Sequence, residues 1–162
     1  MLFIQHELQR TAQNLVADNI KNDEHVLIVS SSDQSKELID AIVSAASSTS
    51  AASVSAIIIA CPEDLKDYKH PPPVIASVKS ADLTIVATTL RFPRAYDDLS
   101  EALFKAGKRQ VLINNAPLED FTRGASLADP IELNRRTHAL AGKISEGKIV
   151  RVKSENGTDL SV

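Results

Sequence analysis

The hydrophobic pattern alternates between short β-branched runs and longer stretches with apolar residues at helical spacing. The most regular short run is Ala-Asp-Leu-Thr-Ile-Val-Ala-Thr-Thr, from Ala81 to Thr89. Because this run is apolar on both alternating faces, it is typical of a central strand covered by helices on both sides. Similar runs complete a set of predicted strands, at residues 25–30, 54–60, 82–87, 110–114 and 148–154.

Between these runs, apolar residues recur every three or four positions, which predicts amphipathic helices. The clearest helix start combines Asp129 as an acidic cap, Pro130 at the first position and Glu132 three residues after the cap. Strands that alternate with helices predict an α/β fold. We expect a doubly wound, mainly parallel five-stranded sheet, Rossmann-like or flavodoxin-like, with the first four strands parallel.

The end of the chain carries the strongest hairpin-turn signal, Asn156-Gly157. Residues 158–162 then begin a return strand. The pattern predicts one α/β domain over residues 1–155, followed by the turn and the start of a C-terminal β-hairpin over residues 156–162. We expect this tail to lead into a second domain, because a natural domain rarely ends within a hairpin arm.

Ligands of open α/β sheets bind beyond the carboxyl ends of the central strands, where the strand order reverses. The candidates for ligand contact are therefore the hydroxyl residues at the end of the central run, the polar end of the fourth strand and the arginines of the following loops. Guanidinium groups at this edge would bind a carboxylate, although solvated loop arginines are common. The predicted substrate-facing residues are Thr88, Thr89, Arg91, Arg94, Asn114 and Arg123.

The polar loop at residues 31–35 lies between the first strand and the next helix. Its hydroxyls or Asp33 could cap that helix, or the helix start could hold a phosphate. We favour capping, because the loop has no glycine and phosphate-binding loops need several. Cys61 follows the second strand without a basic partner in the sequence beside it, which favours a structural residue over a reactive thiol.

Composition narrows the function classes. The 162 residues have a formal net charge of −3, with 18 basic and 21 acidic residues, so we expect no nucleic-acid or membrane partner. A single cysteine excludes an internal disulfide, and the sequence shows no signal peptide or long apolar span. These features predict a cytoplasmic protein.

Motifs for catalysis and metal binding are absent from the sequence. The histidines are scattered and lack the neighbourhood of a zinc site, and the few glycines form neither a nucleophile elbow nor a phosphate loop. We therefore assign no catalytic residue, no metal ligand and no cofactor to this chain. The four histidines are His6, His25, His70 and His138.

Three segments together resemble a known family. They are Pro-Pro-Pro-Val-Ile-Ala-Ser-Val-Lys-Ser-Ala-Asp-Leu-Thr-Ile-Val-Ala-Thr-Thr from Pro71, Arg-Gly-Ala-Ser-Leu-Ala-Asp-Pro-Ile-Glu-Leu-Asn-Arg-Arg-Thr from Arg123, and Lys-Ile-Val-Arg-Val-Lys-Ser-Glu-Asn-Gly-Thr-Asp-Leu from Lys148. They resemble the amino-terminal domain of the aminopeptidase T type leucyl aminopeptidases. The same domain occurs in the related 2,5-dihydroxypyridine dioxygenases.

The resemblance implies a substrate-cleft-forming domain of a two-domain, metal-dependent leucyl aminopeptidase-like protein, inactive alone. It places the divalent metal, or the iron of the dioxygenases, in a second domain beyond the Gly157 turn. The partner would be a small peptide or a carboxylate-bearing small molecule, and homo-oligomers are possible. The alternative is a stand-alone α/β binding or assembly domain without catalysis.

Overall fold

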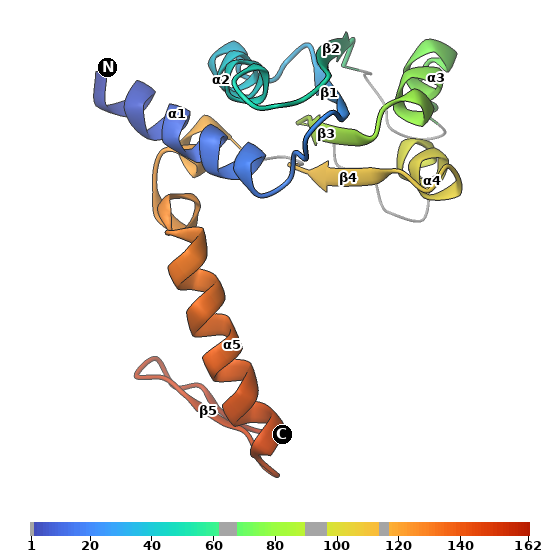
Figure 1. Ribbon diagram of the computed structural model, residues 1–162. Helices are drawn as coiled ribbons and strands as arrows, with labels where there is room; N and C mark the ends of the chain where they lie inside the picture. The colour runs from blue at the N-terminus through green and yellow to red at the C-terminus, as the bar shows by residue number, and fades with distance from the viewer. Residues whose placement is uncertain (1, 62–67, 90–96, 114–116) are drawn as a thin grey trace. The chain divides into compact units, whose positions relative to one another are not determined.

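The computed structural model describes residues 2–61, 68–89, 97–113 and 117–162 (Figure 1). The chain divides into two compact units, Met1–Leu127 and Ala128–Val162. Each unit is described by itself below.

The first unit alternates helices and strands along the chain. Its elements are α1 (Leu2–Ala17), β1 (His25–Ser31), α2 (Lys36–Ser47), β2 (Ser53–Ile59), α3 (Pro72–Ser80), β3 (Leu83–Ala87), α4 (Asp98–Lys105), β4 (Arg109–Leu112) and the 3-10 helices η2 (Leu118–Phe121) and η3 (Gly124–Leu127). The four strands form a parallel sheet in the order β2-β1-β3-β4. The prediction of four parallel strands is therefore confirmed, and the strand order reverses between β1 and β3.

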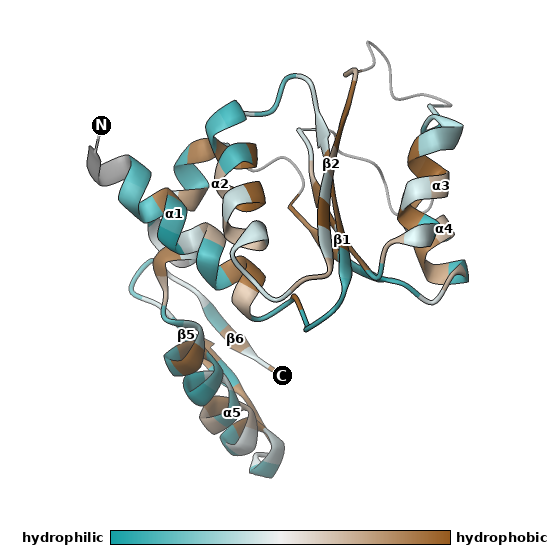
Figure 2. Ribbon diagram, turned by 45° about the horizontal axis from the view of Figure 1, so that its top comes forward, coloured by the Kyte–Doolittle hydropathy of each residue, from teal (hydrophilic) through white to brown (hydrophobic). Residues whose placement is uncertain are grey.

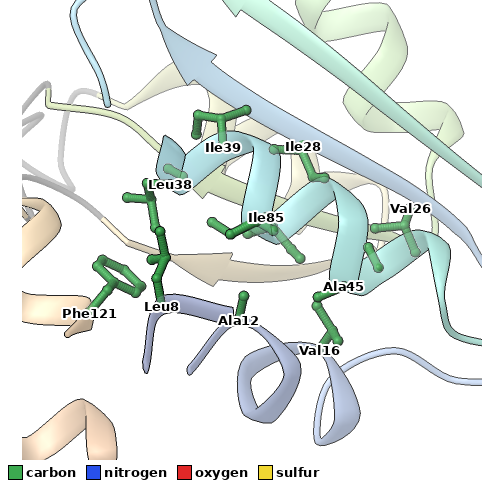
Figure 3. Packing of buried hydrophobic residues seen from close by; sticks show 14 of the residues in the cluster. Leu8, Ala12, Val16, Val26, Ile28, Leu38, Ile39, Ala45, Ile85 and Phe121 are labelled. Atoms are coloured by element: carbon green, nitrogen blue, oxygen red, sulfur yellow. The ribbon is translucent and has the colours of Figure 1, made fainter. Parts of the chain in front are cut away.

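Helices cover both faces of this sheet. α1 and α2 lie on one face, and α3 and α4 lie on the other (Figures 1 and 2). Two apolar clusters fill the space between the sheet and the helices. Figure 3 shows the first cluster, in which side chains of α1 and α2 meet those of β1 and β3. The doubly wound arrangement thus follows from strands that are apolar on both faces.

β3 is buried along its whole length. Its neighbour β1 is also buried after His25, whereas the edge strand β2 is mostly exposed. Leu83 is 1% exposed and Ile85 is 0% exposed, as expected for a central strand. The run from Ala81 to Thr89 therefore holds the middle of the sheet.

Polar contacts fix the amino ends of the central strands. The Asp82 carboxylate accepts a hydrogen bond from the His25 backbone N–H at 3.0 Å and one from Lys108 Nζ at 2.9 Å. The Asp82 backbone N–H donates to the His25 carbonyl at 2.8 Å. The hydrogen bond from the His25 backbone N–H to the carboxylate, followed by that from Lys108, lowers the pKa of Asp82. The register of β1 against β3 is thus set from the amino edge.

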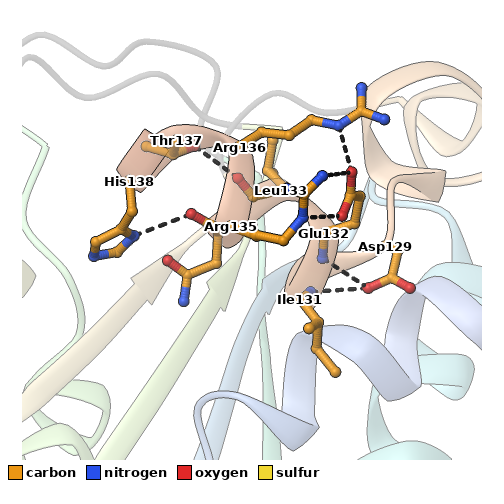
Figure 4. Close-up of polar contacts among 9 residues, drawn as sticks. Asp129, Ile131, Glu132, Leu133, Arg135, Arg136, Thr137 and His138 are labelled. Carbon is orange, nitrogen blue, oxygen red and sulfur yellow. Dashed lines mark hydrogen bonds and ion pairs between the residues drawn. The ribbon is translucent and has the colours of Figure 1, made fainter. Parts of the chain in front are cut away.

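The second unit contains α5 (Pro130–Glu146), β5 (Arg151–Lys153) and β6 (Asp159–Ser161). The side chain of Asp129 accepts hydrogen bonds from the backbone N–H groups of Ile131 and Glu132 (Figure 4). The predicted acidic cap is confirmed. Glu132 also bonds to the guanidinium groups of Arg135 and Arg136.

The segment predicted as a fifth strand of the sheet, residues 148–154, lies elsewhere. Its β5 portion pairs antiparallel with β6 in a separate two-stranded hairpin. Gly157 makes the turn with a φ of +95°, and Arg151 forms an ion pair with Asp159 at 2.9 Å. A nearby partner across a short turn costs less chain entropy than a distant sheet edge. The prediction of five strands in the parallel sheet is not confirmed.

We expect Ile85→Ala to lower the free energy of unfolding by about 2–5 kcal/mol, because it empties a fully buried position. Ile58→Ala removes the same atoms from a side chain that is 55% exposed on β2, and should cost about 1 kcal/mol or less. Urea unfolding of both variants measures the two losses in free energy of unfolding. Equal costs would contradict the central position of β3.

Candidate functional site

The carboxyl ends of β1 and β3 lie side by side at the point where the strand order reverses. Ser31 ends β1, and Thr88 and Thr89 follow β3. In folds with this order, ligands bind at such a switch point. Thr88 and Ser31 are each 2% exposed, whereas Thr89 is half-buried and Asp33 is exposed. At this edge, the more exposed polar groups of Thr89 and Asp33 therefore lie next to the buried residues Ser31 and Thr88.

Hydrogen bonds join these residues into one cluster. The Thr89 hydroxyl donates to Oδ2 of Asp33 at 2.6 Å. The hydroxyl oxygens of Ser31 and Thr89 lie 3.2 Å apart, and the Thr89 backbone N–H donates to the Ser31 hydroxyl oxygen at 3.2 Å. The Cys61 thiol also contacts the Asp33 carboxylate. We call Ser31, Asp33, Cys61 and Thr89 the switch-point cluster.

The cluster carries a stable negative charge. The hydrogen bond from Thr89, followed by that from Ser31, lowers the pKa of Asp33 below its ordinary value. Partial loss of hydration, followed by the hydrogen bond to the Asp33 carboxylate, raises the pKa of the Cys61 thiol. At neutral pH the carboxylate is therefore ionised and the thiol is protonated. A protonated thiol is a poor nucleophile, so this state does not activate Cys61.

The start of α2 is capped by protein groups. Ser35 Oγ accepts a hydrogen bond from the Leu38 backbone N–H at 3.2 Å. Glu37 lies in the first turn of the helix, and Asp33 precedes the cap. Capping is thus confirmed, with Ser35 as the cap, and the two carboxylates beside it would repel a phosphate.

A second polar contact links the later loops of the same edge. Nδ1 of His70 lies 2.6 Å from Oδ1 of Asp98, and the His70 backbone N–H donates to Oδ2 of Asp98 at 3.0 Å. His70 precedes α3, and Asp98 is the first residue of α4. The His70 side chain is 3% exposed and that of Asp98 is 19% exposed. We call these two residues the His70–Asp98 pair.

One group among the residues that the structure describes brings possible metal-ligand atoms within 4.8 Å of one another: His70, Asp97 and Asp98. The contact between Nδ1 of His70 and Asp98 leaves Nε2 as the nitrogen that His70 could offer to a metal. The Asp97 carboxylate accepts from the Leu99 backbone N–H and the Ser100 hydroxyl. These bonds cap α4, and the group offers one histidine, whereas the common non-haem iron site of oxygenases uses two histidines and one carboxylate.

A hollow of about 550 Å³ lies beside α3, toward the amino ends of β1 and β2. Its polar lining consists of one histidine and several serines, His25, Ser53, Ser55, Ser77 and Ser80. Among the residues that the structure describes, its lining includes no carboxylate, cysteine or arginine. The switch-point cluster, at the opposite edge of the sheet, carries the denser chemistry, so we place the candidate site there.

The predicted site residues have different outcomes. Thr88 and Thr89 lie at the switch point, and Thr89 takes part in the cluster. Arg123 is exposed between η2 and η3, where its backbone carbonyl accepts a hydrogen bond from Ser126 at 3.2 Å. Three predicted residues, Arg91, Arg94 and Asn114, lie outside the described residues.

Sequence reasoning missed the other members of the site. The sequence indicates a helix cap or a phosphate site for the loop that holds Ser31 and Asp33, and a structural or a reactive thiol for Cys61, but it does not bring these residues together with Thr89. The available signal was the position of Asp33, two residues after a buried strand at the same predicted edge. His70 and Asp98 gave no such signal, because 28 positions separate them in the sequence.

We expect the carboxyl group of Asp33 to titrate below pH 3.8. Thr89→Val removes the largest cause of this shift and should raise the midpoint toward 3.8. Because folding lowers this pKa, ionised Asp33 stabilises the chain above pH 3.8, and the contribution is lost as the pH falls through the folded value. Carbon NMR of the carboxyl group measures the midpoint. Thr49→Val, at the amino edge, is the control, and an unchanged midpoint in Thr89→Val would refute the assignment.

Comparison with family models identifies the family of this chain, whereas no curated protein matches it. Among the described residues, no helix is long and apolar enough to cross a membrane. The family model described as NicX, 2,5-dihydroxypyridine 5,6-dioxygenase, matches residues 7–162, and the comparisons give no support for an aminopeptidase T type assignment. Since the match covers nearly the whole sequence, the chain belongs to the 2,5-dihydroxypyridine 5,6-dioxygenase family.

Proposed function

We propose that this chain is the amino-terminal domain of a ring-cleaving dioxygenase and forms one wall of its substrate cleft. The observation that carries the proposal is the Asp33–Thr89 hydrogen bond of 2.6 Å, which places a carboxylate at the switch point of the sheet. Family membership supports a hydroxylated pyridine as the substrate class. The cluster provides the polar groups that such a ring needs for orientation.

The chemistry of the cluster matches the polar edge of a hydroxylated pyridine. Such a ring carries hydroxyl hydrogens and, in its keto form, a ring N–H, all of which donate hydrogen bonds. The ionised Asp33 carboxylate accepts them, and the Ser31 and Thr89 hydroxyls both donate and accept. A hydrogen bond to a charged acceptor contributes about 1.5–3 kcal/mol. Orientation of the ring is therefore the role that we assign to this domain.

We place the metal of the reaction in a second domain. The proposal is supported by the composition of the group His70, Asp97 and Asp98, which offers one histidine where the common non-haem iron site uses two. The described residues of this chain would then bind and orient the ring, while ligands elsewhere in the protein hold the metal. We also propose a cytoplasmic location, from the single cysteine.

Among the described residues, no observation supports the other interpretations of the sequence. A leucyl aminopeptidase would need a site for a peptide, and a carboxylate-bearing ligand would need a cation. The switch-point cluster instead presents the negative charge of Asp33. A stand-alone binding domain would share the ring site but not the second domain. Both alternatives, and a homo-oligomer, stay predictions.

We expect the chain to bind 2-hydroxypyridine with a Kd of the order of 1 mM, which corresponds to about 4 kcal/mol. Asp33→Asn should weaken binding about tenfold, because a neutral acceptor replaces a charged one. NMR titration of the backbone amides measures both values. Asp40→Asn, on the exposed face of α2 where Asp40 pairs with Lys36, removes an equal charge as the control.

Benzoate serves as the carboxylate-bearing probe in the same titration. It should leave the amides of Ser31, Asp33 and Thr89 unshifted, because Asp33 repels it. If benzoate binds at these residues more tightly than 2-hydroxypyridine, or if Asp33→Asn and Asp40→Asn behave alike, the proposed role of Asp33 is wrong.

Ferrous iron added to the chain alone should give no cleavage of 2,5-dihydroxypyridine in air, because we assign the metal ligands to another domain. Absorbance of the ring follows the reaction, and iron in buffer without protein sets the background rate. Turnover above that background, in proportion to one bound iron per chain, would place the catalytic centre within these residues.

A further inference from the structure

The two edge strands of the parallel sheet differ in the features that keep an edge from pairing with another chain. β4 has four residues and begins with Arg109, whose guanidinium group donates to the Asn19 carbonyl at 2.9 Å. Lys108 directly precedes it. β2 has seven residues, and the sequence over residues 51–60 contains neither a charged residue nor a proline. Charges, prolines and short strands commonly protect a sheet edge, so β2 lacks the protection that β4 has.

The main chain of β2 directs hydrogen-bonding groups to its outer side. The Ile59 carbonyl accepts a hydrogen bond from the Ser32 backbone N–H at 2.8 Å, so the main-chain groups of Ile59 face β1. These groups alternate in direction along a strand, and every second residue of β2 therefore faces the open side. Among the described residues, no strand pairs with that side. The residues that face it are Val54, Ala56 and Ile58.

The side chains of β2 suit a second copy of the same strand. An antiparallel pair centred on Ala56 places Ala56 opposite its own copy and Val54 opposite Ile58. Ala56 is exposed and Ile58 is 55% exposed, so small and β-branched side chains would cover one another. The three residue pairs would exchange about six main-chain hydrogen bonds, within the range of about 5–15 that a typical interface carries.

The charges nearest this edge also favour an antiparallel copy. α2 packs against β2 in the first apolar cluster. Lys36 and Asp40, whose charged atoms lie 2.5 Å apart, are near the start of α2, whereas the helix ends with the uncharged residues Ser47 and Ser48. A twofold axis at Ala56 brings the start of one α2 toward the end of the other. Like charges therefore stay apart, and a second copy supplies the match by symmetry.

We propose that the outer side of β2 is a dimer interface, where a second copy of this chain adds its own β2 in antiparallel orientation. The twofold axis passes at Ala56, and the two parallel sheets become one continuous sheet. The interface uses no residue of the switch-point cluster. It is therefore independent of the proposed function.

Sedimentation velocity of the full chain over about 5–200 μM should show a dimer that forms with increasing concentration. Ala56→Lys places two ammonium groups opposite each other and should raise the dimer Kd at least about tenfold. In 1 M salt, where the Debye length is about 3 Å, part of the association should return. Salt would not restore a dimer lost through misfolding.

The matched control is Phe104→Lys. Phe104 is 87% exposed on α4 and lines a hollow that also includes Leu112 of β4. This variant adds the same charge at the opposite edge of the sheet and should leave the dimer Kd within twofold of wild type. If Ala56→Lys fails to fold, as judged by its amide spectrum, Ile58→Lys takes its place.

A disulfide tests the register. In the proposed pair the two Ala56 Cα atoms lie about 5.5 Å apart, which is within the range of a disulfide. Oxidised glutathione should therefore link two chains of Ala56→Cys through the introduced thiols, as identified by mass spectrometry of the digested dimer. Ala52→Cys is the control, because its thiols would lie about 27 Å apart across the axis and should not link.

Four outcomes would overturn the proposal. A chain that stays monomeric at about 200 μM leaves the edge to a different partner. A dimer that resists Ala56→Lys, or that Phe104→Lys disrupts instead, uses another surface. Species larger than a dimer indicate open stacking of strands. A link from the introduced thiol of Ala56→Cys only to Cys61 indicates a different register.

Discussion

The pairing of β1 with β3 is the constraint on which the rest of the first unit depends. These strands lie at the centre of the sheet, where Val26 faces Leu83 and Ser30 faces Ala87. The Asp82 contacts fix their amino ends, and the Ser30 hydroxyl donates to the Ala87 carbonyl at 2.8 Å near their carboxyl ends. A slip by one residue would turn every side chain to the opposite face. The switch-point cluster exists because this register brings Ser31 beside Thr89.

The fold was predictable where the local pattern and the global arrangement agree. β1 and β3 are apolar on both faces, and only a sheet covered on both sides buries such strands. The pattern of residues 148–154 is different, because Arg151 and Lys153 alternate with apolar residues. That alternation suits a half-exposed hairpin strand, and the Asn156-Gly157 turn supplies its partner. The turn therefore gives the fifth predicted strand a partner next to it in the sequence, and this partner replaces the edge of the parallel sheet.

The site was predictable only in part, because its members come from separate parts of the chain. The position of Thr88 and Thr89 follows from the general rule for the carboxyl edge of a parallel sheet. The contact of Thr89 with Asp33 spans 56 positions, and that of His70 with Asp98 spans 28. Such pairs depend on strand register and loop path, which a local pattern does not contain. Hydroxyl and carboxyl residues near helix starts also have a local use as caps, as Ser35 and Asp97 show.

The hydrogen bonds of the switch-point cluster limit what this domain can contribute to ligand binding. Asp33 already accepts bonds from Thr89, Ser31 and Cys61, so a ligand adds to these donors or replaces one of them. The net gain per hydrogen bond is then small, and an exposed carboxylate gains little from low dielectric. Tight binding needs a second wall that excludes water from Asp33. Under the proposed function, a domain of this kind would determine how the ring is oriented, while most of the affinity would come from groups that exclude water from Asp33.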